Sequence, residues 1–196
     1  MIVSIMAPKD CSCICVDEKE TMRYLGVTCV DVCTRELFEQ CKAEIMKIAE
    51  PKCAYILADI QNDGDTIDFG FMRVNSKKLA KNLEGCSQAY VFCATLGMGI
   101  DRYYERLSRI SQAKATVFSS VASSLIESFC DYINKELANG KRSKPRFSCG
   151  YGDFCINHQA DILNTLEAGK KLGVCLTENY MMVPVKTVTA IIGIGR

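Results

Sequence analysis

The architecture of this chain depends on the stretch Cys53-Ala-Tyr-Ile-Leu-Ala-Asp-Ile60, Gln61, Asn62-Asp-Gly-Asp65 and Thr66-Ile-Asp-Phe-Gly-Phe-Met-Arg-Val74. The two outer segments are rich in β-branched and aromatic residues, which favour strands. The tetrapeptide between them carries a glycine that can adopt a positive φ, as tight hairpin turns require. We therefore predict a hairpin between residues 53–60 and 66–74. Because hairpins pair antiparallel strands, the sheet should be largely antiparallel.

Hydrophobic periodicity outside this stretch predicts that helices and strands interleave along the chain. Apolar residues recur every three to four positions over residues 34–49, which predicts a helix that ends before Pro51. Further helices are predicted over 76–83, 100–110, 113–137 and 157–172, and further strands over 2–7, 89–95 and 185–194. The predicted fold class is α+β, a mixed, largely antiparallel sheet with helices packed on it.

The helix predicted over 113–137 is unusual in its many small residues. They are Ser119, Ser120, Ala122, Ser123 and Ser124. Their density indicates that another helix or a ligand approaches the helix backbone closely.

Length and composition exclude several classes of protein. The chain has 196 residues, of which 48% are hydrophobic and 24% charged, with a net charge of +1. This predicts one domain over residues 1–196, with 1–22 as a candidate N-terminal extension. A near-neutral charge argues against a nucleic-acid partner. The sequence contains no apolar run of bilayer length and no secretory signal, so we expect no membrane partner and a cytoplasmic location.

The cysteine content is high, at 13 residues. In a reducing compartment, we expect these cysteines to be free thiols that mostly pack as small hydrophobic side chains. The cluster Cys11-Ser-Cys13-Ile-Cys15 lacks the two-residue gap typical of zinc ligands, and His158 is the only histidine. We predict no metal site, while a thiol redox or metal-binding protein built on these cysteines stays open as an alternative.

The familiar catalytic motifs are absent from the sequence. No G-x-S-x-G elbow and no Walker loop occur, and any catalytic triad would have to use His158. The glycines of Gly97-Met-Gly99 fit a strand-to-helix turn better than a phosphate loop. No residue is therefore predicted to be catalytic.

One segment does suggest ligand binding. Arg146-Phe-Ser-Cys-Gly-Tyr151 combines a guanidinium, a glycine and an aromatic ring, which can together hold a small ligand that bears an anion. Upstream, Glu127 lies among apolar residues of the predicted helix. Its carboxylate either faces solvent or is held for a cation, and periodicity does not decide between these two interpretations.

The same segment carries a resemblance to a known family. Arg146-x-x-x-Gly150-Tyr151 resembles the R-x-x-x-G-Y motif of the activation domain of cobalamin-dependent methionine synthase. Residues 176–189, Leu-Thr-Glu-Asn-Tyr-Met-Met-Val-Pro-Val-Lys-Thr-Val-Thr, resemble its L-T-E-S-x-x-M-x-P-x-x-S-V-S block. Residues 94–102 and 125–129 look like segments of stand-alone versions of this domain. The resemblance extends from about Tyr24 to Gly195.

The resemblance implies a binding site for S-adenosylmethionine. Arg146 would bind the carboxylate of the methionine moiety and Glu127 its ammonium group, while the main chain at Ser148, Gly150 and Tyr151 would shape the remainder. Asp31 and Asp59 are the candidates for a further acidic contact of the family. Cys149 stands where the family often has proline, and its thiol is either a packing group or a redox-sensitive neighbour of the site.

The resemblance also implies a function. The chain would be a stand-alone reactivation module that supports reductive methylation of cob(II)alamin on a separate corrinoid methyltransferase. That partner would carry the cobalamin and would be, for example, a methionine synthase lacking its own activation domain. Flavodoxin or another donor would supply the electron. The alternative is a non-enzymatic partner of a corrinoid protein, on the same fold, that has lost ligand binding.

Overall fold

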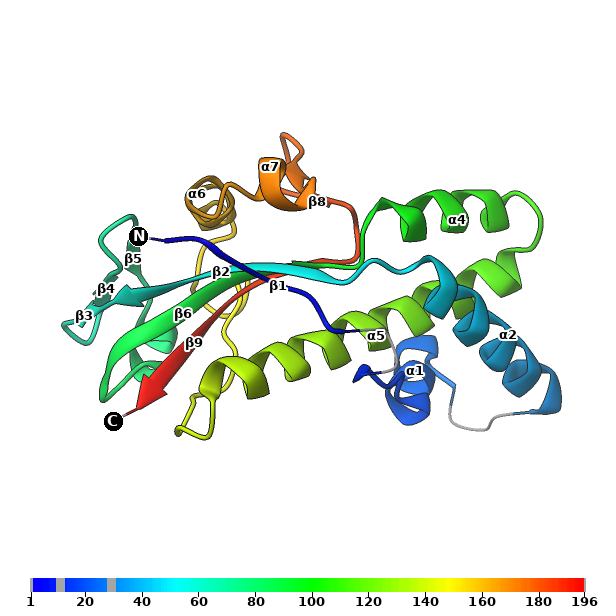
Figure 1. The fold of residues 1–196 in the computed structure, drawn as a ribbon, viewed down its shortest axis with the longest axis horizontal. Coiled ribbons are helices and arrows are strands. Elements are labelled where there is room, and N and C mark those ends of the chain that lie inside the picture. The colour runs from blue at the N-terminus through cyan, green and yellow to red at the C-terminus, as the bar shows by residue number, and fades with distance from the viewer. Residues whose placement is uncertain (1, 10–12, 28–30, 196) are drawn as a thin grey trace.

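The computed structural model describes residues 2–9, 13–27 and 31–195. Its main sheet has four strands in the order β1 (Ser4–Met6), β2 (Lys52–Asp59), β6 (Cys86–Thr95) and β9 (Thr187–Gly195). Every neighbouring pair in this sheet is antiparallel. Together with the helices packed on both faces, this confirms the predicted fold class (Figure 1).

The predicted hairpin between residues 53–60 and 66–74 is wrong. β2 pairs with β6 over its whole length, from Lys52 opposite Thr95 to Asp59 opposite Gln88. The Asn-Asp-Gly-Asp turn instead joins two short strands, β3 (Gln61–Asn62) and β4 (Thr66–Asp68), and β5 (Arg73–Asn75) completes a separate small sheet. Gly70, at φ +81°, and a hydrogen bond from the Phe69 N–H to the Met72 carbonyl reverse the chain. The segment 66–74 is therefore two strands rather than one long one.

Seven helices occur in the described part of the chain. They are α1 (Glu18–Leu25), α2 (Val32–Ile48), α3 (Lys77–Asn82), α4 (Met98–Ser108), α5 (Gln112–Ala138), α6 (His158–Thr165) and α7 (Ala168–Leu172). α1 was not predicted. The helix predicted over 157–172 is divided into α6 and α7 because Glu167 adopts a positive φ of 50°. A small hairpin of β7 (Cys175–Leu176) and β8 (Met182–Val183) precedes β9.

The sheet separates two hydrophobic cores. Successive side chains of a strand point to opposite faces, and in β6 Phe92 and Ala94 enter one core while Val91 and Cys93 enter the other. The first core lies against α1, α2, α4 and α5, and the second lies against α3, α6 and α7. Figure 1 shows the long helix α5 along one side of the sheet and α6 with α7 on the opposite side.

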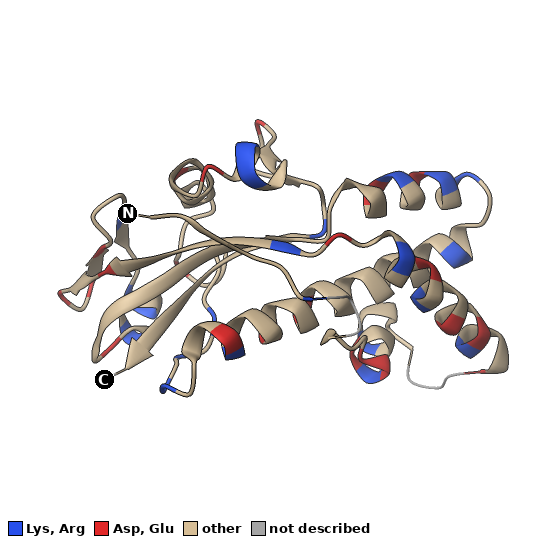
Figure 2. Cartoon of the chain, in the orientation of Figure 1, with Lys and Arg blue, Asp and Glu red and all other residues tan. Residues whose placement is uncertain are grey.

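The segment that follows α5 runs along the free edge of β9. The Lys144 N–H donates to the Gly193 carbonyl at 2.9 Å, and Phe147 exchanges backbone hydrogen bonds with Ile191 at 3.0 and 2.9 Å. This pairing fixes Arg146 beside the C-terminal half of α5. In the parts of the chain that are described, no helix, including the 27-residue α5, is long and apolar enough to cross a membrane. Acidic and basic residues are interspersed along α2 and α4 (Figure 2).

Candidate functional site

The candidate site is built around the guanidinium of Arg146. Its Nη2 lies 2.9 Å from Oε2 of Glu127, and its Nη1 lies 2.5 Å from Oδ1 of Asp131. Glu127 and Asp131 are four residues apart on α5, so they project from the same face of the helix. The two predicted charged residues are therefore brought together, and they bind each other directly.

The Arg146 side chain is largely buried, with 19% of its surface exposed. Burial by itself would lower its pKa, but the carboxylates of Asp131 and Glu127 outweigh that effect, so its pKa is raised. The guanidinium is therefore a permanent cation. It is positioned by two carboxylates of unequal exposure, 38% for Glu127 and 74% for Asp131.

These three residues line an open cavity of about 700 Å³. Ser148 and Tyr151, both predicted site residues, also line it. The remaining lining residues are Asn82, Asn134, Pro145 and Phe147. The side-chain oxygens of Asn82 and Asn134 are buried and accept no hydrogen bond within the described structure. A ligand in this cavity would thus meet one cation, two carboxylates and two amide side chains.

Gly150 shapes the wall of the cavity but does not itself line it. Its φ of +85° favours glycine, and its N–H donates to the Phe154 carbonyl at 2.8 Å, which closes a tight turn. The turn presents Tyr151, whose ring packs edge-on against Phe147 with 5.3 Å between ring centroids. Tyr151 remains 68% exposed, so one face of its ring is available to a ligand.

Cys149, which departs from the family motif, is buried in the second core. Burial raises the pKa of its thiol to about 12. The thiol therefore stays protonated at neutral pH, which is typical of a packing group and not of a reactive cysteine.

Asp31 and Asp59 are not at this cavity. Asp31 caps the N-terminus of α2, where its Oδ1 accepts the Thr34 N–H at 2.7 Å, and this hydrogen bond lowers its pKa. Asp59 accepts a hydrogen bond from the side chain of Gln88 at 2.9 Å. The Asp31 carboxylate thus stabilises the start of α2, and the Asp59 carboxylate links β2 to β6.

The cysteine cluster is only partly visible, because Cys11 lies outside the described residues. Cys13 and Cys15 are both exposed. Within the described residues, no group of three cysteine, histidine or acidic side chains is arranged to hold a metal ion.

Sequence reasoning missed Asp131, Asn82 and Asn134. Asp131 could have been found, because it follows Glu127 by one helical turn on a helix that was predicted with nearly correct bounds. Asn134 could have been found in the same way, because it follows Glu127 by seven residues, or two helical turns, on α5. Asn82 carries no such signal. Asn82 comes from the end of α3, 45 residues before Glu127, and only the tertiary structure brings it to the cavity.

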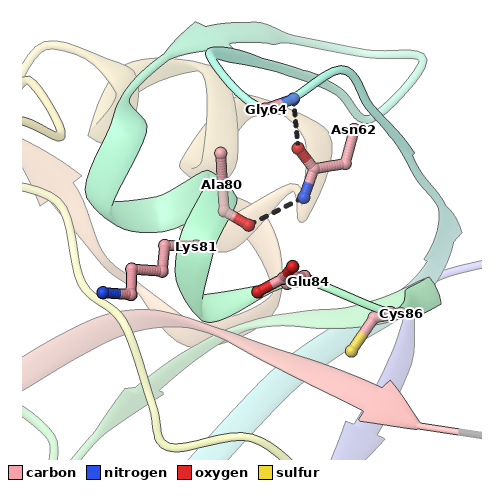
Figure 3. A pocket seen from close by; sticks show the side chains of 7 residues that line it. Asn62, Gly64, Ala80, Lys81, Glu84 and Cys86 are labelled. Carbon is pink, nitrogen blue, oxygen red and sulfur yellow. Dashed lines mark hydrogen bonds between the residues drawn. The ribbon is translucent and has the colours of Figure 1, made fainter.

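A second cavity, of about 540 Å³, lies between the small sheet and α3, and Figure 3 shows its lining residues. The Asn62 amide there donates to the Ala80 carbonyl at 2.8 Å and accepts the Gly64 N–H at 3.0 Å. These bonds hold the turn against α3. In Figure 3, the Lys81 side chain points away from Asn62, so the polar groups of this cavity do not converge.

Comparison with known proteins finds a similarity in structure. The chain is similar in structure to the MetH reactivation domain crystallised with AdoHcy, with a TM-score of 0.75 and 16% sequence identity. The alignment covers 98% of this chain and 78% of that chain. No family model matches the sequence, and no curated protein matches it. The similarity shows that the two proteins share a fold.

Proposed function

We propose that this chain binds S-adenosylmethionine (AdoMet) in the cavity around Arg146. We further propose that it supports reductive methylation of cob(II)alamin on a separate corrinoid methyltransferase such as methionine synthase. The observation that carries the proposal is the Arg146–Glu127 pair, which lines a 700 Å³ cavity in a fold shared with a reactivation domain bound to AdoHcy. Flavodoxin or another donor would supply the electron.

The groups in the cavity fit the chemistry of this ligand. Its methionine part carries a carboxylate and an ammonium, which match a guanidinium and a carboxylate. Its adenosine part carries hydroxyl and amino groups, which match the polar side chains of Asn82, Asn134 and Ser148 that line the cavity. The exposed ring of Tyr151 offers a face to the sulfonium cation or to a base.

Each residue of the chain would act by binding and orienting the ligand. Arg146 would bind the ligand carboxylate with the guanidinium edge that Asp131 now occupies, while Glu127 would keep its hydrogen bond to Nη2. The turn at Ser148 and Gly150 would hold the ligand by main-chain contacts. When bound, AdoMet supplies an electrophilic methyl group, and the cobalt of the partner accepts it together with one electron.

Calorimetry with AdoMet and AdoHcy tests the binding step. Wild-type protein should bind both ligands, and Arg146→Ala should weaken binding about 10- to 100-fold, since a charged hydrogen bond contributes about 1.5–3 kcal/mol. Arg146→Lys keeps the charge but loses the planar fork, so its affinity should be intermediate. Lys81→Ala, which removes a cation from the second cavity, is the matched control and should bind as wild type does.

The role on cobalt is tested separately. Wild-type protein, AdoMet and a one-electron reductant should convert cob(II)alamin on a corrinoid methyltransferase to methylcobalamin, with one AdoHcy released for each methyl transferred. The absorbance of the corrinoid reports the conversion. Wild-type protein that binds neither AdoMet nor AdoHcy would remove the proposal at its first step.

The second candidate function is a partner of a corrinoid protein that has lost ligand binding. One observation favours it, because the guanidinium of Arg146 is already bound by two carboxylates of the same chain. Under this function, the protein would form a complex with the corrinoid protein, and Arg146→Ala would leave that complex unchanged.

A further inference from the structure

A second charged cluster lies closer to the N-terminus of α5. The Lys186 ammonium donates to Ser119 Oγ at 3.1 Å and to Ser123 Oγ at 2.8 Å. The Ser123 hydroxyl donates to the Ser119 carbonyl at 3.0 Å, so towards Lys186 it acts only as an acceptor. Within the described structure, one N–H of Lys186 and the hydroxyl hydrogen of Ser119 therefore have no acceptor. Both are available to an anionic oxygen.

Two carboxylates lie on the other side of this cluster. Asp101, in the first turn of α4, accepts the Val185 N–H through Oδ2 at 2.8 Å, and Glu105 follows one helical turn later. Lys186 and Asp101 interact electrostatically, yet Lys186 forms no ion pair with any described carboxylate. Burial lowers the pKa of Lys186 and raises the pKa of Asp101. Neither charge is fully compensated by the other.

The charged groups border a cavity of about 450 Å³ with a mainly apolar wall. Its apolar lining residues are Met98, Ile100, Tyr104, Phe118, Val183 and Val185. Ile100 and Phe118 are fully buried, whereas Met98, Tyr104 and Val185 are exposed. An apolar cavity with a few convergent polar groups is the usual form of a small-molecule site.

We propose that this cavity binds an α-amino acid with an apolar side chain. Its carboxylate would contact Lys186 and Ser119, its ammonium would contact Asp101 and Glu105, and its side chain would pack on the apolar wall. A simple anion would face two carboxylates, and a simple cation would face the ammonium of Lys186. A zwitterion compensates the charge of Lys186 with its carboxylate and the charges of Asp101 and Glu105 with its ammonium.

This site is separate from the one around Arg146. Ser119 and Glu127 are eight residues apart on α5, which places their backbones about 12 Å apart along the helix axis. The proposal therefore does not depend on AdoMet binding, and each site can be tested without the other.

Calorimetry with L-leucine, L-methionine and L-phenylalanine tests the proposal. At least one should bind wild-type protein with a dissociation constant of about 1 mM or below. For leucine, the analogue without the ammonium is 4-methylpentanoate, and the analogue without the carboxylate is 3-methylbutylamine. Each analogue should bind about tenfold more weakly, as should glycine, which lacks the apolar side chain.

Substitutions of single residues test which side chains bind the amino acid. Lys186→Met and Asp101→Asn should each weaken amino-acid binding about tenfold or more. Ser119→Ala, a milder change that leaves the Lys186–Ser123 bond in place, should weaken it less. Lys81→Ala, in the cavity beside α3, should leave amino-acid binding unchanged, and Ser119→Ala should leave AdoMet binding unchanged.

Three results would overturn the proposal: no binding of any of the three amino acids, equal binding of leucine and its two analogues, or unchanged binding in folded Asp101→Asn and Ser119→Ala proteins. Circular dichroism establishes that each variant is folded. Failure of AdoMet binding in the same preparation would count against the proposed function alone.

Discussion

The guanidinium of Arg146 is held by two carboxylates of the chain, and one of these contacts can be exchanged for a ligand carboxylate. Glu127 is the more buried of its two carboxylate partners, and Asp131 is the more exposed. An exposed ion pair contributes little free energy, about 0–1 kcal/mol, because water screens it. Asp131 is thus the contact that a ligand carboxylate can replace at small cost, while Glu127 keeps the guanidinium in position.

Replacement of Asp131 by Asn should therefore strengthen AdoMet binding. The variant removes the negative charge that competes for Nη1, so we expect a gain of up to about fivefold in affinity, since the competing pair contributes about 1 kcal/mol or less. Calorimetry with AdoMet measures the change. Asp59→Asn removes an exposed carboxylate that is distant from the cavity and should leave the affinity unchanged. Weaker binding by Asp131→Asn would show that Asp131 itself contacts the ligand.

At the scale of elements, α5 organises both cavities and also anchors α1. The fully buried Ser124 Oγ accepts the Asp17 N–H at 3.1 Å and donates to the Asp17 carbonyl at 3.0 Å. These two bonds fasten the N-terminus of α1 to the middle of α5. Of the two alternatives for the small residues of α5, the structure shows the approach of another helix, since α1 is fastened at Ser124. Ser119 and Ser123 instead accept hydrogen bonds from the Lys186 side chain.

Replacement of Ser124 by Ala should loosen α1. The Asp17 N–H and carbonyl would lose their partner, which should lower the free energy of unfolding by about 1–3 kcal/mol. Hydrogen exchange of the α1 amides should become faster, and chemical denaturation measures the loss of stability. Ser128→Ala is the matched control on the same helix, because Ser128 forms no side-chain hydrogen bond in the described structure. An equal loss in both variants would contradict the role of Ser124.

At the scale of the whole molecule, buried thiols link stability to pH. Burial raises the pKa of Cys41 to about 11 and those of Cys93 and Cys149 to about 12, and it also raises the pKa values of Cys53 and Cys130. In the unfolded chain, a thiol ionises near its ordinary pKa of about 9. Above that pH, the unfolded state has lost these protons while the folded state retains them.

We therefore expect full stability from these thiols below about pH 9 and a progressive loss between about pH 9 and 12. Each thiol contributes up to about 1.4 kcal/mol per pH unit in that window. Denaturant titrations under anaerobic, reducing conditions measure the slope. Cys149→Ala should make the decline with pH less steep, whereas Cys155→Ala, which removes an exposed thiol, serves as the control. A decline equally steep in Cys149→Ala and wild type would contradict this account.

Helices and strands whose hydrophobic period and end signals lie within a few neighbouring residues were predictable from the sequence. The helix predicted over 113–137 is α5 (Gln112–Ala138), and the strand predicted over 89–95 lies within β6 (Cys86–Thr95). Both follow from periodicity and from end signals within a few residues, such as Asn139, which ends α5 in a left-handed conformation. α1 escaped prediction because its eight residues are too few for a clear apolar period and because its stability depends on contacts with α5.

The resemblance of Arg146-x-x-x-Gly-Tyr151 pointed to one segment of the chain, and Glu127, Ser148 and Tyr151 line one cavity with Arg146. Only the tertiary structure decided that Glu127 and Arg146 bind each other, that Asp131 shares the guanidinium, and that β2 pairs with β6 instead of residues 66–74. The physical reason is the range of the interactions. Helix periods and caps depend on neighbours in sequence, whereas strand partners and ion pairs depend on which distant segments the two cores bring together.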